Sequence, residues 1–249
     1  MTWVKICGLT NEEDALLAIA MGADALGFIF AQGSQRQVQA PLVADIVKRL
    51  PPSVTTIGVF RNDLPERVIR TVERCGLSGA QLHGLETIEQ TAEVASRVPF
   101  VIKAFAIDDP ALKTARRYRV DSLLVDAPAP GSGKTFDWSL LDALPTGKRW
   151  ILAGGLHSGN VAEAIRATQP WGVDVASGVE ASPGHKDPRL VREFIRAAKQ
   201  ALPAMPDTLG FNGEAANDLD GADDLLNGAH NRWSQFESSE APFDFEIDG

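Results

Sequence analysis

Several side chains that can move protons or bind anions lie just after short apolar runs of the sequence. They supply a thiol, an imidazole, a carboxyl group and two fixed cations, and they are Cys7, Arg36, His83, Lys103 and Asp126. A thiol and a carboxyl group can act as base and acid, and a guanidinium can bind both oxygens of a carboxylate. The two cysteines, Cys7 and Cys75, do not have the spacing of a metal site, so we expect neither a metal nor a cofactor.

Two glycine-bearing loops could bind a phosphate group. Gly154-Gly155 follows the apolar run at residues 150–153, and Ser177-Gly178 follows the run at residues 173–175. In a barrel of parallel strands, the loops after the last two strands commonly bind phosphate through backbone N–H groups. We therefore expect a phosphate site at these four residues, although glycines that only form tight turns would give the same pattern.

Eight short apolar runs alternate with segments of helical period, which predicts parallel strands with helices between them. The runs are residues 3–6, 25–30, 55–60, 79–82, 100–105, 122–125, 150–153 and 173–175. Helices are expected within residues 41–50, 64–74 and 86–97, and a last helix should begin at Asp187-Pro188. A capping box from Thr10 to Glu13 should begin the first helix.

This pattern predicts the α/β class and a closed (β/α)8 TIM barrel over residues 1–203. An open doubly wound sheet is less favoured because no G-x-G-x-x-G motif follows a strand. In such a barrel the chemistry comes from residues at the carboxyl ends of the strands, where the candidate side chains lie.

The charge of the chain is concentrated in its last part. The net charge is −9, and residues 204–249 hold eleven acidic residues and one basic residue, so this segment carries −10 and residues 1–203 carry +1. We expect residues 204–249 to be an acidic tail, disordered or loosely docked, whose aromatic residues leave a protein partner possible. An acidic chain argues against a nucleic-acid partner.

Neither a membrane span nor a secretory signal is expected. No apolar run approaches the ~18 residues that a membrane helix needs. The amino terminus lacks the charged and apolar regions of a signal peptide, which predicts a cytoplasmic location.

Short motifs that recur in order between residues 3 and 200 resemble those of the phosphoribosylanthranilate isomerase family. The two most specific are Lys-Ile-Cys-Gly at residues 5–8 and Gly-Ser-Gly-Lys-Thr-Phe-Asp-Trp at residues 131–138. We expect residues 131–134 of the second motif to form a mobile loop over the site. The chain departs from the family pattern at Gln35, where proline is usual, and at Ala176, where serine is common.

The resemblance implies an Amadori rearrangement of the phosphosugar N-(5-phosphoribosyl)anthranilate in tryptophan biosynthesis. It implies that Cys7 is the base that removes the proton from C2 of the sugar and that Asp126 is the acid that opens the ring. Arg36 is implied to hold the anthranilate carboxylate. We expect His83 and Lys5 to bind substrate as well, and Lys5 to favour the thiolate of Cys7.

Two other kinds of function are to be weighed against the isomerase. A ribulose-phosphate epimerase would need metal-binding His and Asp residues at strand ends, and the related isomerase of histidine biosynthesis would need paired aspartates; neither pattern is present in the sequence. A non-catalytic phosphosugar-binding or regulatory barrel whose acidic tail recruits a partner stays open, and an activity assay would separate it from the enzyme.

We predict that the acidic tail is dispensable for folding, because residues 1–203 already contain all eight strand and helix repeats. Truncation after Pro203 should change the melting temperature by only a few degrees, the scale of a ~1 kcal/mol change. Thermal unfolding of residues 1–203 and of the full chain, followed by circular dichroism, measures this. A loss of soluble protein on truncation would show that the tail packs on the barrel.

Overall fold

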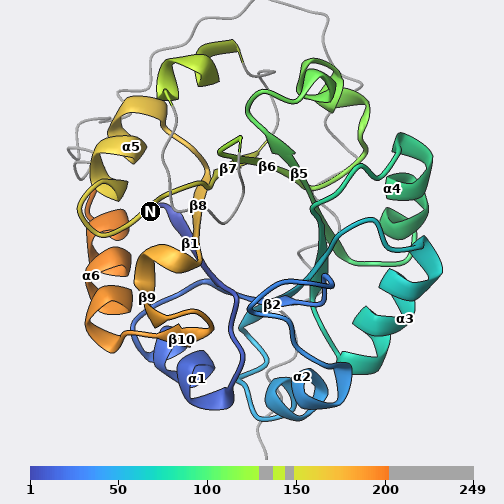
Figure 1. Cartoon of the computed structure of the whole chain (residues 1–249), viewed down its shortest axis with the longest axis horizontal. Helices are drawn as coiled ribbons and strands as arrows, with labels where there is room; N and C mark the ends of the chain where they lie inside the picture. Colours follow the sequence, from blue (N-terminus) through green and yellow to red (C-terminus); the bar gives the residue numbers. More distant parts are fainter. Residues whose placement is uncertain (129–136, 144–148, 202–249) are drawn as a thin grey trace, which may run out of the picture. The chain divides into compact units, whose positions relative to one another are not determined.

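The structure is a computed structural model that describes residues 1–128, 137–143 and 149–201. Figure 1 shows these residues as a ring of strands surrounded by helices. The acidic tail and residues 131–136 of the motif expected to cover the site lie outside the described ranges. The predictions made for them stay predictions.

Eight parallel strands form a closed barrel in chain order. They are β1 (Trp3–Cys7), β2 (Ala25–Ile29), β3 (Thr55–Phe60), β4 (Gly79–Leu82), β5 (Phe100–Ala106), β6 (Ser122–Asp126), β7 (Trp150–Leu152) and β8 (Gly172–Val175). The barrel closes where β1 pairs with β8, with Lys5 opposite Asp174 in the register. The predicted (β/α)8 barrel is confirmed.

Helices lie outside the ring of strands (Figure 1). They are α1 (Glu12–Ala20), α2 (Ala40–Val47), α3 (Pro65–Cys75), α4 (Ile88–Ala95), α5 (Val161–Thr168) and α6 (Pro188–Lys199). The predicted start of α6 is confirmed, because the Asp187 side chain accepts hydrogen bonds from the backbone N–H groups of Arg189 and Leu190 and Pro188 follows it. Within the described ranges, no helix is long and apolar enough to cross a membrane.

Three stretches differ from a simple alternation of strands and α-helices. The connections after β5 and β6 contain the 3-10 helices η1 (Pro110–Arg117) and η2 (Trp138–Ala143). A short 3-10 helix, η3 (Ser177–Val179), follows β8, and the antiparallel strands β9 (Glu180–Ser182) and β10 (His185–Lys186) come next. The apolar pattern did not indicate the β9–β10 hairpin because its strands are short and largely polar.

Alternate residues of each strand face the barrel interior and the helices. The interior holds a small apolar cluster made of Ile57, Ile102, Ala104, Leu124, Ile151 and Ala153. Lys103 lies between Ile102 and Ala104, so it faces the helix layer, where Nζ lies 3.0 Å from Oε2 of Glu86. Although Lys103 is near the carboxyl end of β5, its side chain therefore does not point into the barrel.

The prediction of a capping box at Thr10 is wrong. The N-cap of α1 is Asn11, whose side chain accepts a hydrogen bond from the backbone N–H of Asp14 at 2.8 Å. The Thr10 hydroxyl instead donates to the carbonyl O of Gly184 in the hairpin after β8. This tertiary contact, over 174 positions of sequence, turns the Thr10 side chain toward Gly184, and the helix takes its cap from the next residue, Asn11.

Replacing Asn11 by Ala should lower the free energy of unfolding by about 1 kcal/mol, because the N–H of Asp14 loses its acceptor. For a domain of this size the melting temperature should fall by about 2–4 °C. Asn11→Ser, which keeps a capping oxygen, is the control and should stay close to the parent chain in thermal unfolding. An unchanged melting temperature for Asn11→Ala would contradict the assignment of the cap.

Candidate active site

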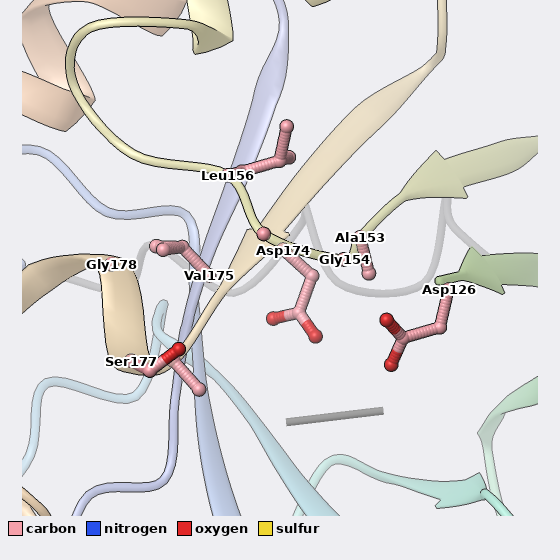
Figure 2. A pocket seen from close by; sticks show the side chains of 10 residues that line it. Asp126, Ala153, Gly154, Leu156, Asp174, Val175, Ser177 and Gly178 are labelled. Carbon is pink, nitrogen blue, oxygen red and sulfur yellow. The ribbon is translucent and has the colours of Figure 1, made fainter. Parts of the chain in front are cut away.

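One cavity lies at the carboxyl ends of β6, β7 and β8 (Figure 2). It is lined by all four residues predicted to bind phosphate, Gly154, Gly155, Ser177 and Gly178, and by Asp126. The structure thus brings the glycine-bearing loops after β7 and β8 together beside the carboxyl group predicted to be the acid.

Glycine is required in these loops by backbone geometry and by close packing. Gly154 and Gly155 have φ angles of 86° and 63°, in the left-handed region that side chains disfavour. A Cβ atom at Gly178 would lie 1.9 Å from the carbonyl O of Leu156, so the two loops approach each other at backbone distance. Residues of both loops therefore line one cavity, the arrangement that a phosphate site between two loops needs.

Asp126 ends β6, and its carboxyl group points into this cavity (Figure 2). Its Oδ1 atom accepts a hydrogen bond of 2.7 Å from the backbone N–H of Ala127, and its Oδ2 atom lies 3.4 Å from Nε2 of His83. Nδ1 of His83 lies 2.9 Å from the side-chain amide nitrogen of Gln81. The Gln81 amide nitrogen as donor to Nδ1 corresponds to the tautomer with the ring proton on Nε2, on the side of Asp126.

Cys7 ends β1, beside the buried ion pair of Lys5 and Asp174. Nζ of Lys5 donates to Oδ1 of Asp174 at 2.9 Å, and the Lys5 side chain is fully buried. A Cβ atom at Gly27 would lie 2.7 Å from Sγ of Cys7 and 3.1 Å from Nζ of Lys5, so both atoms fill the space that Gly27 leaves open on β2. The carboxyl group of Asp174 also points into the cavity that Asp126 lines (Figure 2).

Burial raises the pKa of the Cys7 thiol above its ordinary value. The ammonium of Lys5 acts in the opposite direction, as predicted, but it does not outweigh burial, and the carboxylate of Asp174 adds to the rise. Lys5 thus lowers the pKa of Cys7, as expected, but the net shift of that pKa is upward, so the expected thiolate is not favoured overall. In the free protein near neutral pH, Cys7 is a thiol.

Arg36, in the loop after β2, is held by a carboxylate that the sequence did not point to. Its Nε and Nη2 atoms donate to the two carboxylate oxygens of Glu180, each at 2.7 Å. Lys186 also binds Glu180, with Nζ 3.0 Å from Oε1. Burial disfavours the carboxylate of Glu180, but Arg36 and Lys186 outweigh that effect and hold its pKa below the ordinary value. The pair leaves Nη1 of Arg36 as the nitrogen not used by Glu180.

Metal ligands are not gathered in this site. Among residues 1–128, 137–143 and 149–201, no group of three or more His, Cys, Asp or Glu side chains is placed to hold a metal ion. The groups of this site that can transfer protons or bind anions are the thiol, the carboxyl groups and the cations.

Comparison with known proteins places this chain in a family. The family model described as N-(5'phosphoribosyl)anthranilate (PRA) isomerase matches residues 4–197. The chain belongs to this family. The resemblance seen in the sequence motifs is thereby confirmed.

Members of the PRA isomerase family match almost over their whole lengths. The N-(5'-phosphoribosyl)anthranilate isomerase of Pelobacter propionicus is 47% identical over 205 residues, which cover 80% of this chain and 97% of that protein. The crystal structure of phosphoribosyl anthranilate isomerase from Thermus thermophilus has a TM-score of 0.76 and 42% identity, covering 80% of this chain and 99% of that one.

A second solved structure of the PRA isomerase family contains a ligand. It is a complex with reduced 1-(o-carboxyphenylamino)-1-deoxyribulose 5-phosphate, and it has a TM-score of 0.72, 40% identity, and coverage of 80% of this chain and 100% of that one. The ligand named there is a phosphosugar that carries a carboxyphenyl group.

Sequence reasoning missed four polar residues of this PRA isomerase site, namely Gln81, Asp174, Glu180 and Lys186. An acidic residue within the apolar run at residues 172–175 was the available signal for Asp174, since an unpaired carboxylate is costly to bury. Glu180 and Lys186 gave no comparable signal, because charged residues in a loop are ordinarily solvated. Lys5, predicted to bind substrate, is instead fully buried against Asp174.

We predict that the Cys7 thiol titrates above the ordinary ~8.5 of a cysteine, because burial disfavours its thiolate. A raised pKa leaves the protonated form dominant at neutral pH, so ultraviolet absorbance of the thiolate should appear only on the alkaline side. A Cys75→Ala background leaves Cys7 as the titrating cysteine. Thiolate absorbance already complete at neutral pH would contradict this prediction.

Proposed function

We propose that the chain catalyses the Amadori rearrangement of N-(5'-phosphoribosyl)anthranilate to 1-(2-carboxyphenylamino)-1-deoxyribulose 5-phosphate in tryptophan biosynthesis. The observation that carries this proposal is the cavity lined by Asp126 together with Gly154-Gly155 and Ser177-Gly178. The chain belongs to the PRA isomerase family, which supports the same reaction. The solved relative with a bound product analogue supports the same substrate class.

The phosphate group is proposed to bind at Gly154-Gly155 and Ser177-Gly178. Backbone N–H groups can bind a phosphate without a nearby cation, and all four residues line the same cavity. A phosphate bound there would place the sugar across the barrel mouth, with its ring near Asp126.

Asp126 is proposed to be the acid of the first step. Its carboxyl group gives a proton to the ring oxygen of the furanose, the bond between that oxygen and C1 breaks, and the nitrogen lone pair forms the C=N bond of a Schiff base. His83, whose Nε2 lies 3.4 Å from Oδ2 of Asp126, is placed to orient this carboxyl group or to contact the released hydroxyl group. Both roles suit the ring proton on Nε2.

Cys7 is proposed to be the base of the second step. The thiolate form of Cys7, which is the minor form at neutral pH, takes the proton from C2. The electrons of that C–H bond form a C1=C2 bond, and the C=N electron pair moves to the nitrogen. Transfer of a proton to C1 and loss of the C2 hydroxyl proton then give the ketose. Asp126 and Cys7 are at the ends of β6 and β1, which are separated in the barrel by β7 and β8, so acid and base approach the sugar from different directions.

Arg36 is proposed to bind the carboxylate of the anthranilate ring. Its bidentate pair with Glu180 fixes the plane of the guanidinium and leaves Nη1 for a ligand. Lys5 is proposed to act on the substrate only indirectly, through Cys7 and Asp174, because its side chain is fully buried. A protein partner for residues 204–249 also stays a prediction.

Cys7→Ala and Asp126→Asn should each lower kcat by at least ~10²-fold, because each removes one of the two proton-transfer groups. The loss of anthranilate-derivative fluorescence on turnover measures the rate, and circular dichroism checks that each variant is folded. Cys75→Ala removes a thiol far from this cavity and is the matched control, with near-parental kcat expected.

Two outcomes would contradict the proposed function. A folded parent chain without turnover would favour the non-catalytic phosphosugar-binding alternative. Near-normal turnover by Cys7→Ala would mean that another group is the base.

A further inference from the structure

Lys186, in β10, has a buried ammonium group that binds three acceptors from different parts of the site. Its Nζ donates to the carbonyl O of Cys7 at 2.7 Å, to the carbonyl O of Ala176 at 3.0 Å and to Oε1 of Glu180 at 3.0 Å. The side chain has no solvent exposure. An ammonium has three protons, so its donor capacity is used in full.

We propose that Lys186 is a positioning residue of the isomerase reaction, a proposal that rests on the function given above. Each acceptor belongs to a different part of the proposed site. Cys7 is the base, Ala176 directly precedes the phosphate loop at Ser177, and Glu180 binds Arg36. One cation therefore fixes the base, the phosphate loop and the carboxylate-binding arginine relative to one another.

The simpler reading, that Lys186 only anchors the β9–β10 hairpin, is disfavoured by other anchors of that hairpin. The backbone N–H of Lys186 donates to Oδ2 of Asp14 at 3.0 Å, and the Thr10 hydroxyl donates to the carbonyl O of Gly184. The backbone N–H of Asp187 donates to the carbonyl O of Val179 at 3.0 Å. The first two bonds attach the hairpin to Asp14 of α1 and to Thr10, and the third joins the two ends of the hairpin. None of them involves the ammonium, so the hairpin keeps these attachments without it.

The ion pair of Arg36 and Glu180 does not depend on Lys186. Glu180 would keep both of its hydrogen bonds to Arg36, so no carboxylate is left buried without a cation. What would be lost is the hold on the carbonyl groups of Cys7 and Ala176. The consequence falls on the geometry of the site more than on the stability of the barrel.

Lys186 also contributes charge near the base. The charged groups around the Cys7 thiol are Lys5 on the same strand, Asp174 on β8, Arg36 in the loop after β2, and Lys186 on β10 beside Glu180. Removal of one of these cations makes the thiolate less favourable, so the Cys7 pKa should rise further. A cation that anchored the hairpin at a distance from the thiol would leave this titration unchanged.

Lys186→Met is the direct test, and Lys199→Met is its matched control. Lys199 also forms an ion pair, with Asp24, but it lies in α6 on the outside of the barrel. We expect kcat/KM to fall about 10–10²-fold for Lys186→Met, the scale expected when reacting groups are misplaced by ~1 Å. The variant should stay folded, with a melting temperature lowered by several degrees because the carbonyl groups of Cys7 and Ala176 lose a donor. Lys199→Met should keep the parental kcat/KM. Parental kcat/KM for Lys186→Met would overturn the proposal.

Coupling to Glu180 distinguishes positioning from a general loss of structure. If Lys186 acts partly through Glu180 and Arg36, the loss caused by Lys186→Met should be smaller in a Glu180→Gln background, which leaves no buried carboxylate without a cation, than in the parent chain. Strictly multiplicative losses in kcat/KM would overturn this route of action.

Titration of Cys7 tests Lys186 independently of turnover. In the Cys75→Ala background, Lys186→Met should move formation of the Cys7 thiolate to higher pH, whereas Lys199→Met should not. If the Met variant does not fold, Lys186→Gln, which keeps a donor but no charge, takes its place. A parent chain without turnover would refute the proposed function alone, and an unshifted titration would refute the role of Lys186 alone.

Discussion

The pairing of β1 with β8 is the constraint on which the rest of the site depends. Lys5 and Asp174 are partners in this register, and their ion pair of 2.9 Å lies across the line where the barrel closes. A buried pair adds little net stability, but the loss of one partner costs about 3–5 kcal/mol because the other charge stays buried. The pair lies across this closure, and the same register puts Cys7 next to the loop after β8.

Buried ammonium groups hold the loops at the mouth of the barrel. Lys186 binds carbonyl groups of Cys7 and Ala176, and Lys103 binds the carbonyl O of Gly84 at 2.8 Å and Glu86 at 3.0 Å, in the loop that follows His83. Loops that present backbone N–H groups to a ligand have little apolar surface to bury. A buried lysine that donates to several acceptors fixes such loops in place of apolar packing.

Burial favours the thiol form of Cys7, whereas its proposed role as a base needs the thiolate. The closed barrel excludes water from the end of β1, which raises the pKa of the thiol and makes the base form scarce. The same exclusion strengthens the electrostatic effect of Lys5 and Lys186 on that sulfur. Lys5 and Lys186 therefore reduce the rise in the Cys7 pKa that burial in the barrel causes.

The sequence by itself determined the barrel and the residues at its mouth. Strands buried on both faces need nearly continuous apolar runs, so the strands could be located to within one or two residues, and residues that follow them, such as Cys7 and Asp126, had to lie at the carboxyl ends. Only the tertiary structure decided which side chains meet. Arg36 and Glu180 are 144 positions apart, and the sequence carries no signal for their pairing. Strand register and barrel closure likewise decide which side Lys103 faces, which residue Thr10 contacts and how far the pKa of Cys7 is raised. They set the distances between loops, which local periodicity does not encode.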